Sequence, residues 1–266
     1  MPNAKDGGWK DATGTATIAR NGSVWSVLSL DRQTRTAYWA LICFTAGARA
    51  QTSITFNASG TGGDGTLDAQ ADFTISNGQI KVTITNLLNP STIKSIGQSV
   101  SDLRFTISNA PGMMAGMTAV GQLADVANGG KVTDVSGTPG RWISSTTGGF
   151  AITGDTILLE AIGHGKPTEL ILPSDGGAGY PDANASIVVH SADTDGPATF
   201  ILALAGVTDS TTISNVRFSF GTSPDTSLAG TPVSVTSEPS SMLLFGTGFL
   251  GVGFLVRKRL LPRAPC

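Results

Sequence analysis

Short segments in which polar and apolar residues alternate follow one another through the middle of the chain. Alternation with period two, combined with β-branched and aromatic residues, is the pattern of a half-buried β-strand. Asn77-Gly78 separates two of these segments, and this dipeptide favours a two-residue hairpin turn. We therefore expect strands at 53–57, 71–75, 80–85, 103–107, Ile152, 157–160, 170–172, 187–190, 198–204 and 213–220, with the second and third paired as a hairpin.

Loops rich in Gly, Ser and Pro separate the later strands, mainly at 136–149 and 174–185. The segment Met113–Asp125 lacks clear alternation, so we expect it to be less extended. Many short strands with turns between them predict an all-β fold, a single antiparallel β-sandwich or jelly-roll-like domain over residues 51–232. A C-terminal transmembrane helix is expected to follow this domain.

Charge divides the chain into three parts. Residues 1–50 hold six basic and three acidic residues, residues 51–237 seven and fifteen, and residues 238–266 four and one, so the net charges are +3, -8 and +3. An acidic body disfavours nucleic-acid binding, because phosphate affinity needs clustered Lys and Arg. It disfavours anionic membrane surfaces for the same reason. Only 14 % of the residues are charged, and Thr and Ser supply the polarity, which is typical of exported all-β proteins.

An apolar run at 37–48 has the features of a secretory signal peptide. Arg32 and Arg35 precede it, and Ala48-Arg49-Ala50 follows as a small-x-small cleavage site. We therefore expect a signal peptide at 37–50, with Ala48 and Ala50 recognised and cleavage after Ala50. The run is too short to span a bilayer; the alternative is a buried strand or helix of a folded domain.

Residues 1–36 do not fit the basic flank of such a signal. They are polar, much longer than that flank, and include Trp9 and Trp25. We expect a misassigned start, with the true one downstream at a codon such as that of Val27. Residues 1–50 as a whole are then a leader.

No catalytic motif stands out in the acidic body. It contains no cysteine, because Cys43 and Cys266 lie in the end segments, and His164 and His190 are the only histidines. Neither lies in a nucleophile elbow, a metalloprotease helix motif or a phosphate-binding loop. A nucleophile–histidine pair formed only in space stays the alternative. We expect no catalytic residue, no metal and no cofactor.

Two stretches place side-chain oxygens close together in sequence: Asp182, Asn184, Asp193 and Asp195. Calcium takes about six to eight oxygen ligands, so turn chemistry on loops is the expected role of these residues. Tyr180 could stack on a sugar ring, although a loop aromatic is more often structural. Apart from Trp142, it is the only Trp or Tyr in the body.

The chemistry changes at Ser237. Glu238-Pro239 ends an extended linker at 233–240, sixteen uncharged residues follow, and then come the basic residues Arg257, Lys258 and Arg259. Sixteen residues form a helix of about 24 Å, slightly short of a ~30 Å hydrocarbon core, but basic side chains at the end can snorkel. The basic cluster predicts that residues 260–266 are cytoplasmic. The expected membrane helix, within 241–259, comprises Ser241, Met242, Leu243, Leu244, Phe245, Gly246, Thr247, Gly248, Phe249, Leu250, Gly251, Val252, Gly253, Phe254, Leu255 and Val256.

This three-part tail resembles the PEP-CTERM sorting signal of Gram-negative bacteria. Glu238 and Pro239 match the motif, the Gly-rich apolar stretch matches its helix, and the basic cluster matches its end, while Ser237 stands in place of the first Pro. The resemblance implies export through the Sec translocon, a precursor held transiently in the inner membrane, and processing by exosortase. The tail is then a protease substrate, and the protein reaches the cell surface or the extracellular matrix.

The resemblance and the lack of a catalytic motif favour a non-enzymatic component of a biofilm or exopolysaccharide matrix. Extracellular polysaccharide is the expected partner, and nucleic acid is not. The first alternative is a carbohydrate-binding module on a β-sandwich, which the scarcity of aromatic residues weakens. The second is an exported hydrolase, which would need His164 or His190 beside an acid and a nucleophile.

Overall fold

The computed structural model describes residues 16–20, 23–27, 52–109 and 111–233. The chain divides into two units, residues 1–48 and 49–266. In the first unit, β1 (Ala16–Arg20) and β2 (Ser23–Val27) form an antiparallel pair. The expected signal peptide and membrane helix lie outside the described residues. In the described part of the chain, no helix combines the length and the apolarity needed to cross a membrane.

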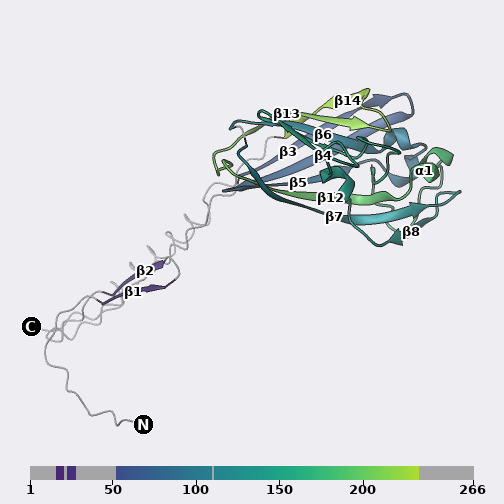
Figure 1. The fold of residues 1–266 in the computed structure, drawn as a ribbon. Helices are drawn as coiled ribbons and strands as arrows, with labels where there is room; N and C mark the ends of the chain where they lie inside the picture. Colours follow the sequence, from purple (N-terminus) through teal and green to yellow (C-terminus); the bar gives the residue numbers. More distant parts are fainter. Residues whose placement is uncertain (1–15, 21–22, 28–51, 110, 234–266) are drawn as a thin grey trace, which may run out of the picture. The chain divides into compact units, whose positions relative to one another are not determined.

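The second unit consists mostly of β-strands, with a few short helices between them (Figure 1). The strands are β3 (Thr52–Gly62), β4 (Gly65–Ser76), β5 (Gln79–Asn86), β6 (Val100–Ile107), β7 (Met114–Val126), β8 (Val132–Val135), β9 (Ala151–Thr153), β10 (Thr156–Glu160), β11 (Ile171–Leu172), β12 (Asp193–Leu204), β13 (Ile213–Phe220), β14 (Thr226–Ala229) and β15 (Thr231–Val233). The helices are η1 (Pro90–Thr92), η2 (Ile96–Gln98), η3 (Gly140–Ile143) and α1 (Ala185–His190).

All strands of this unit belong to one sheet. Its main path is β14-β13-β6-β11-β12-β5-β4-β3-β15; β10 and β9 branch from β6, and β7 and β8 branch from β12. The short strand β11 joins the two halves, because it pairs antiparallel with β6 and parallel with β12. The prediction of an all-β fold is confirmed. The sheet is mixed and not wholly antiparallel as predicted, because β11 pairs parallel with β12 and links both halves into one sheet.

The sheet encloses a large hydrophobic core. Phe73 of β4 packs edge-on against Phe105 of β6 with ring centroids 4.9 Å apart, although these strands are not neighbours in the sheet. The two halves therefore face each other, and apolar residues at every second strand position fill the space between them. A smaller cluster, which includes Ile93, Leu172 and Ile187, lies beside α1.

Two segments differ from the sequence predictions. Residues 187–190, expected as a strand, lie in α1, where the Asn184 side chain caps the helix by accepting the Ser186 N–H at 2.8 Å. Only Ile187 of this helix is buried, so the β-branched residues of this segment do not form part of a sheet. Residues 113–125, expected to be less extended, lie mostly in β7, because β12 pairs with β7 along most of its length.

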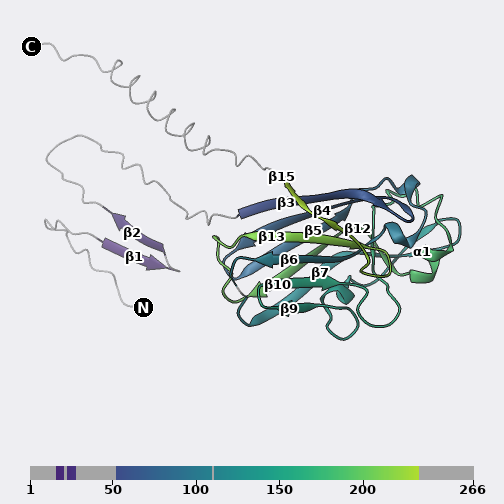
Figure 2. The same ribbon diagram turned by 90° about the horizontal axis from the view of Figure 1, so that it is seen from above.

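Both ends of the described sheet unit lie at the same end of the sheet. β15 runs antiparallel to β3 with Val233 opposite Thr55, so the last residue of β15 lies beside the first residues of β3 (Figure 2). From there β3 extends roughly 33 Å to Gly62. We call the end with Thr52 and Val233 the tail end. The opposite end, with the β3–β4 turn and α1, is the distal end.

Candidate functional site

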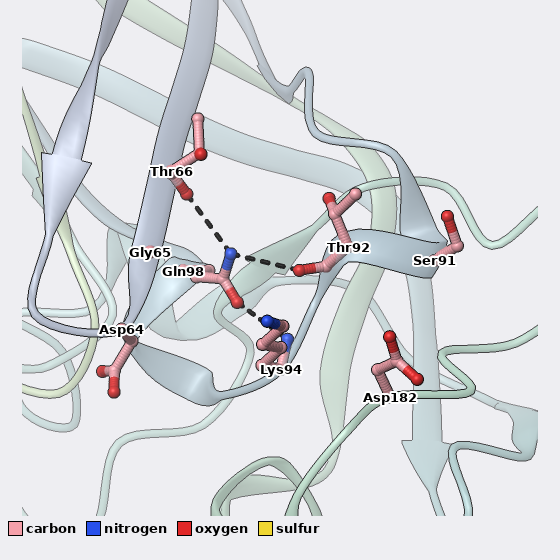
Figure 3. A pocket seen from close by; sticks show the side chains of 8 residues that line it. All are labelled: Asp64, Gly65, Thr66, Ser91, Thr92, Lys94, Gln98 and Asp182. Atoms are coloured by element: carbon pink, nitrogen blue, oxygen red, sulfur yellow. Dashed lines mark hydrogen bonds between the residues drawn. The ribbon is translucent and has the colours of Figure 1, made fainter.

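A polar cleft of about 360 Å³ opens at the distal end, between the β3–β4 turn, the η1–η2 segment and the loop before α1 (Figure 3). It is lined by Asp64, Gly65, Thr66, Ser91, Thr92, Lys94, Gln98 and Asp182. Residues that are far apart in the sequence thus meet here because the sheet brings their loops to one end.

Gln98 organises the cleft from its centre, as Figure 3 shows. Its Oε1 accepts the Lys94 N–H at 2.7 Å, and its Nε2 donates to the carbonyl oxygens of Thr66 and Thr92, each at 3.3 Å. The side chain also closes a capping box with Ser95 at the start of η2. Because Gln98 is only 2 % exposed, its amide makes its hydrogen bonds within the protein and not with solvent. These bonds link β4 to the η1–η2 segment.

A second buried amide supports this arrangement. Asn86, at the end of β5, donates from Nδ2 to the carbonyl oxygens of Gln98 at 2.9 Å and Ile171 at 3.2 Å. Its Oδ1 accepts the Leu88 N–H at 3.1 Å. Asn86 thus connects the floor of the cleft to β11, where the two halves of the sheet meet.

The groups that the cleft offers to solvent are carboxylates, an ammonium group and hydroxyls. Asp64, Lys94 and Asp182 are exposed, and Asp64 and Asp182 appear on either side of Lys94 in Figure 3. Gly97 lets Asp64 lie close to η2, because a Cβ at Gly97 would come within 1.9 Å of Asp64 Oδ2. Such groups bind polar ligands through hydrogen bonds. Among the described residues, no cluster of three or more His, Cys, Asp or Glu side chains could hold a metal ion.

The loop before α1 also borders a second polar depression, of about 690 Å³. Asp175 shapes this loop, since its carboxylate accepts the N–H groups of Gly177 at 2.9 Å and Gly179 at 3.1 Å. Across from it, Gly130 has φ 73° and lies against the Tyr180 backbone, where a Cβ would come within 1.7 Å of the carbonyl oxygen. The glycines therefore allow two loops to approach closely and line this depression.

Tyr180 cannot stack on a sugar, because it is fully buried. Its hydroxyl donates to the Pro173 carbonyl oxygen at 2.7 Å and lies 2.9 Å from Asp195 Oδ1. Burial, with Asp195 as the next cause, raises the pKa of Tyr180 well above its usual value. Trp142 is also fully buried and donates from Nε1 to the Glu169 carbonyl oxygen at 2.7 Å. The stacking role considered for Tyr180 is wrong, and both aromatic residues support the fold.

Asp193 and Asp195 lie in β12, and the expectation that they occupy a loop is wrong. Asp195 Oδ1 accepts the Asp175 N–H at 2.8 Å. Asp193 is 1 % exposed, and neither of its carboxyl oxygens has a hydrogen-bond partner within the described residues. Burial raises the pKa of Asp193 well above its usual value, and the charge of Asp125 adds to the shift.

Of the other two loop residues, Asn184 caps α1, as turn chemistry predicts, and Asp182 lines the cleft. The two histidines lie elsewhere. His190 ends α1 with Nδ1 2.8 Å from the Pro167 carbonyl oxygen. The carbonyl oxygen of His164 accepts a hydrogen bond from Arg141. In the described part of the chain, no hydrogen bond joins either imidazole to a hydroxyl or a carboxylate.

Of the residues that line the cleft, sequence reasoning singled out only Asp182, as a loop residue. One signal was available, because Ser95 and Gln98 have the spacing of a capping box. Asp64 gives no such signal, and nothing in the sequence places Asp182 beside it, since the two residues meet only through the topology of the sheet.

The predicted sorting residues lie outside the described residues: Glu238, Pro239, the helix residues 241–256, the basic cluster 257–259, and Ala48 and Ala50 at the signal cleavage site. Comparison with protein families tests the tail directly. The family model described as the PEP-CTERM protein-sorting motif matches residues 235–259. Comparison with curated proteins and with solved structures gives no match. The sequence-based resemblance of the tail is thereby confirmed.

Proposed function

We propose that this protein, which carries a PEP-CTERM sorting motif at residues 235–259, is a non-enzymatic component of an extracellular polysaccharide or biofilm matrix. The motif is the observation that carries the proposal. It supports an exported protein that passes through a membrane-anchored precursor, is processed by exosortase and is directed to the cell surface. The role in the matrix is our proposal, which goes beyond the export and processing that the motif supports.

The position of the motif relative to the fold supports this proposal. The match begins at Val235, two residues after β15 ends at Val233, and β15 lies at the tail end of the sheet. A precursor anchored through its tail therefore holds the domain at one end. The distal end lies about 33 Å from this attachment point along β3.

The chemistry of the distal end suits a hydrated polymer. The cleft offers the carboxylates of Asp64 and Asp182, the ammonium group of Lys94 and several hydroxyls. These groups exchange hydrogen bonds with sugar hydroxyls at little cost, because both partners stay partly solvated. The cleft also favours a carbohydrate-binding domain as a second candidate. The burial of Trp142 and Tyr180 means that any such binding would proceed without these two aromatic platforms.

Processing and location test the proposal together. In cells that produce exosortase, we expect the processed protein in the extracted matrix. The double variant Glu238→Ala, Pro239→Ala should stay in the membrane fraction at precursor mass, because the protease no longer recognises it. Arg263→Ala, a change outside the matched residues, serves as the control and should behave like the wild type. Immunoblots of membrane, medium and matrix fractions give the answer.

Normal processing of the double variant would contradict the sorting role of these two residues. Processed wild-type protein that occurs only in the medium or the membrane would contradict the matrix role and leave sorting intact.

A further inference from the structure

The outer face of the β10-β6-β13-β14 half of the sheet carries two arginines directly opposite each other. Arg104 of β6 pairs in register with Arg217 of β13, and both residues are exposed. Like charges at opposed positions of an antiparallel pair destabilise the pair. The third arginine of the acidic body, Arg141, instead donates to the backbone oxygens of Ala161 and His164. A body with a charge of -8 therefore places its two remaining guanidinium groups at one point.

A cavity of about 80 Å³ lies beside these arginines, lined by Asp102, Arg104, Arg217, Ser219, Pro224 and Ser227. Holding one water molecule takes about 10–15 Å³ of such space, so the cavity has room for a carboxylate or sulfate group. Arg217 donates from Nη2 to Ser227 Oγ at 2.7 Å. This bond holds the guanidinium at the cavity and reduces the entropy that ligand binding would cost.

Two carboxyl groups lie in the next row of the same face. Glu160 of β10 pairs in register with Asp102 of β6, and Asp102 pairs with Ser219 of β13. Within the described residues, no hydrogen bond joins Arg104 or Arg217 to either carboxyl group, so their guanidinium donors are available. Burial raises the pKa of Asp102 to about 6; the Ser219 hydroxyl opposes this shift, Glu160 adds to it, and both arginines oppose it.

We propose that Arg104 and Arg217 form a binding subsite for an oxyanion, a carboxylate or sulfate group, carried by an acidic polysaccharide. A guanidinium group presents a planar fork of donors that matches such an anion. The opposed arginine pair, the small cavity and the Arg217–Ser227 hydrogen bond are the observations that support an anion as the ligand. The identification of the carrier as a polysaccharide rests on the proposed matrix function.

Affinity electrophoresis of the full-length chain in detergent tests the subsite. The gels contain polygalacturonate for carboxylate, dextran sulfate for sulfate, or neutral dextran. We expect one or both acidic polymers to retard the protein and dextran to have no effect. Arg104→Gln and Arg217→Gln should each weaken binding at least tenfold. Lys131→Gln removes an exposed charge from the other half of the sheet and should change binding less than twofold.

The pH dependence gives a readout that a general loss of surface charge would not change. Ionised Asp102 repels an anion in the cavity, so wild-type binding should strengthen several-fold from pH 7.5 to pH 5. Asp102→Asn should bind at pH 7.5 as tightly as the wild type binds at pH 5. Thermal melting of each variant confirms that it is folded.

Two results would overturn the subsite: arginine variants that bind like Lys131→Gln, or an absence of retardation by both acidic polymers. Arginine-dependent binding combined with no protein in the matrix fraction would keep the subsite. It would overturn only the assignment of the anion to a matrix polysaccharide.

Discussion

Two sets of buried polar side chains in this domain differ in how their polar atoms are satisfied. Gln98 and Asn86, beneath the distal cleft, are neutral amides that spend their donors and acceptors on backbone groups. Asp193 and Asp102 are carboxyl groups whose pKa values are raised mainly by burial. A satisfied amide stabilises the fold, whereas a buried carboxylate is costly when it ionises. The contribution of the first set to the stability of the fold should therefore be independent of pH, whereas the second set should destabilise the fold increasingly as its carboxyl groups ionise.

The largest expected effect comes from Gln98→Ala. This change removes four hydrogen bonds and leaves the carbonyl oxygens of Thr66 and Thr92 without these donors, so we expect a loss of about 3 kcal/mol in the free energy of unfolding. Chemical denaturation measures it. Gln79→Ala, which changes a glutamine of β5 with no side-chain hydrogen bond to a described residue, should cost much less. Equal losses would show that the amide network is not what supports the cleft.

Asp193 should give the widest pH dependence. Its folded pKa lies above the unfolded value of about 3.9, so the folded state retains a proton that the unfolded state loses. Stability should then fall as the pH rises above about 4, by at most ~1.4 kcal/mol per pH unit for one group, and level off above the folded pKa. Asp193→Asn should remove this slope, while the exposed Asp125→Asn should remove little of it. Unfolding curves from pH 4 to 8 decide; an unchanged slope in Asp193→Asn would contradict the assignment.

The sequence predicts what depends on neighbouring residues along the chain. Asn77-Gly78 gives the β4–β5 hairpin, with Ile75 opposite Ile80 and φ 79° at Gly78. The sorting tail is predictable for the same reason, because a protease reads a linear segment. These predictions needed no knowledge of the rest of the fold.

What depends on distant partners was predicted poorly. β7 is extended because β12 lies beside it, and α1 is helical because Asn184 caps a run that no strand partners. The two residues of β11 that join the halves of the sheet carry no distinctive signal. Asp64 and Asp182 are 118 positions apart, so only the topology of the sheet reveals the cleft.

Asp102 should show a narrower pH dependence than Asp193. Its pKa is raised to about 6, so stability should decline only between about pH 3.9 and pH 6, by roughly 3 kcal/mol in total. Above that range the contribution is flat, because both states are then ionised. Asp102→Asn should abolish the decline in this window and leave the rest of the curve unchanged. A slope that persists in this variant would show that another group titrates in this range. Glu160, whose pKa is also raised by burial, would be the next to test.

The smallest expected effect is that of a change at Tyr180. Its hydroxyl is neutral and hydrogen-bonded, like the amides of the first set, but lies among carboxyl groups, like those of the second set. It donates to the Pro173 carbonyl oxygen and lies beside Asp195, so it belongs with the satisfied groups although carboxylates surround it. Tyr180→Phe keeps the buried ring and removes only the hydroxyl, which should cost about 1 kcal/mol at neutral pH. Because the phenol stays protonated throughout, the loss should be nearly constant from pH 6 to 8, measured by chemical denaturation. A loss that grows with pH in that range would mean that the hydroxyl's main role is to stabilise ionised Asp195.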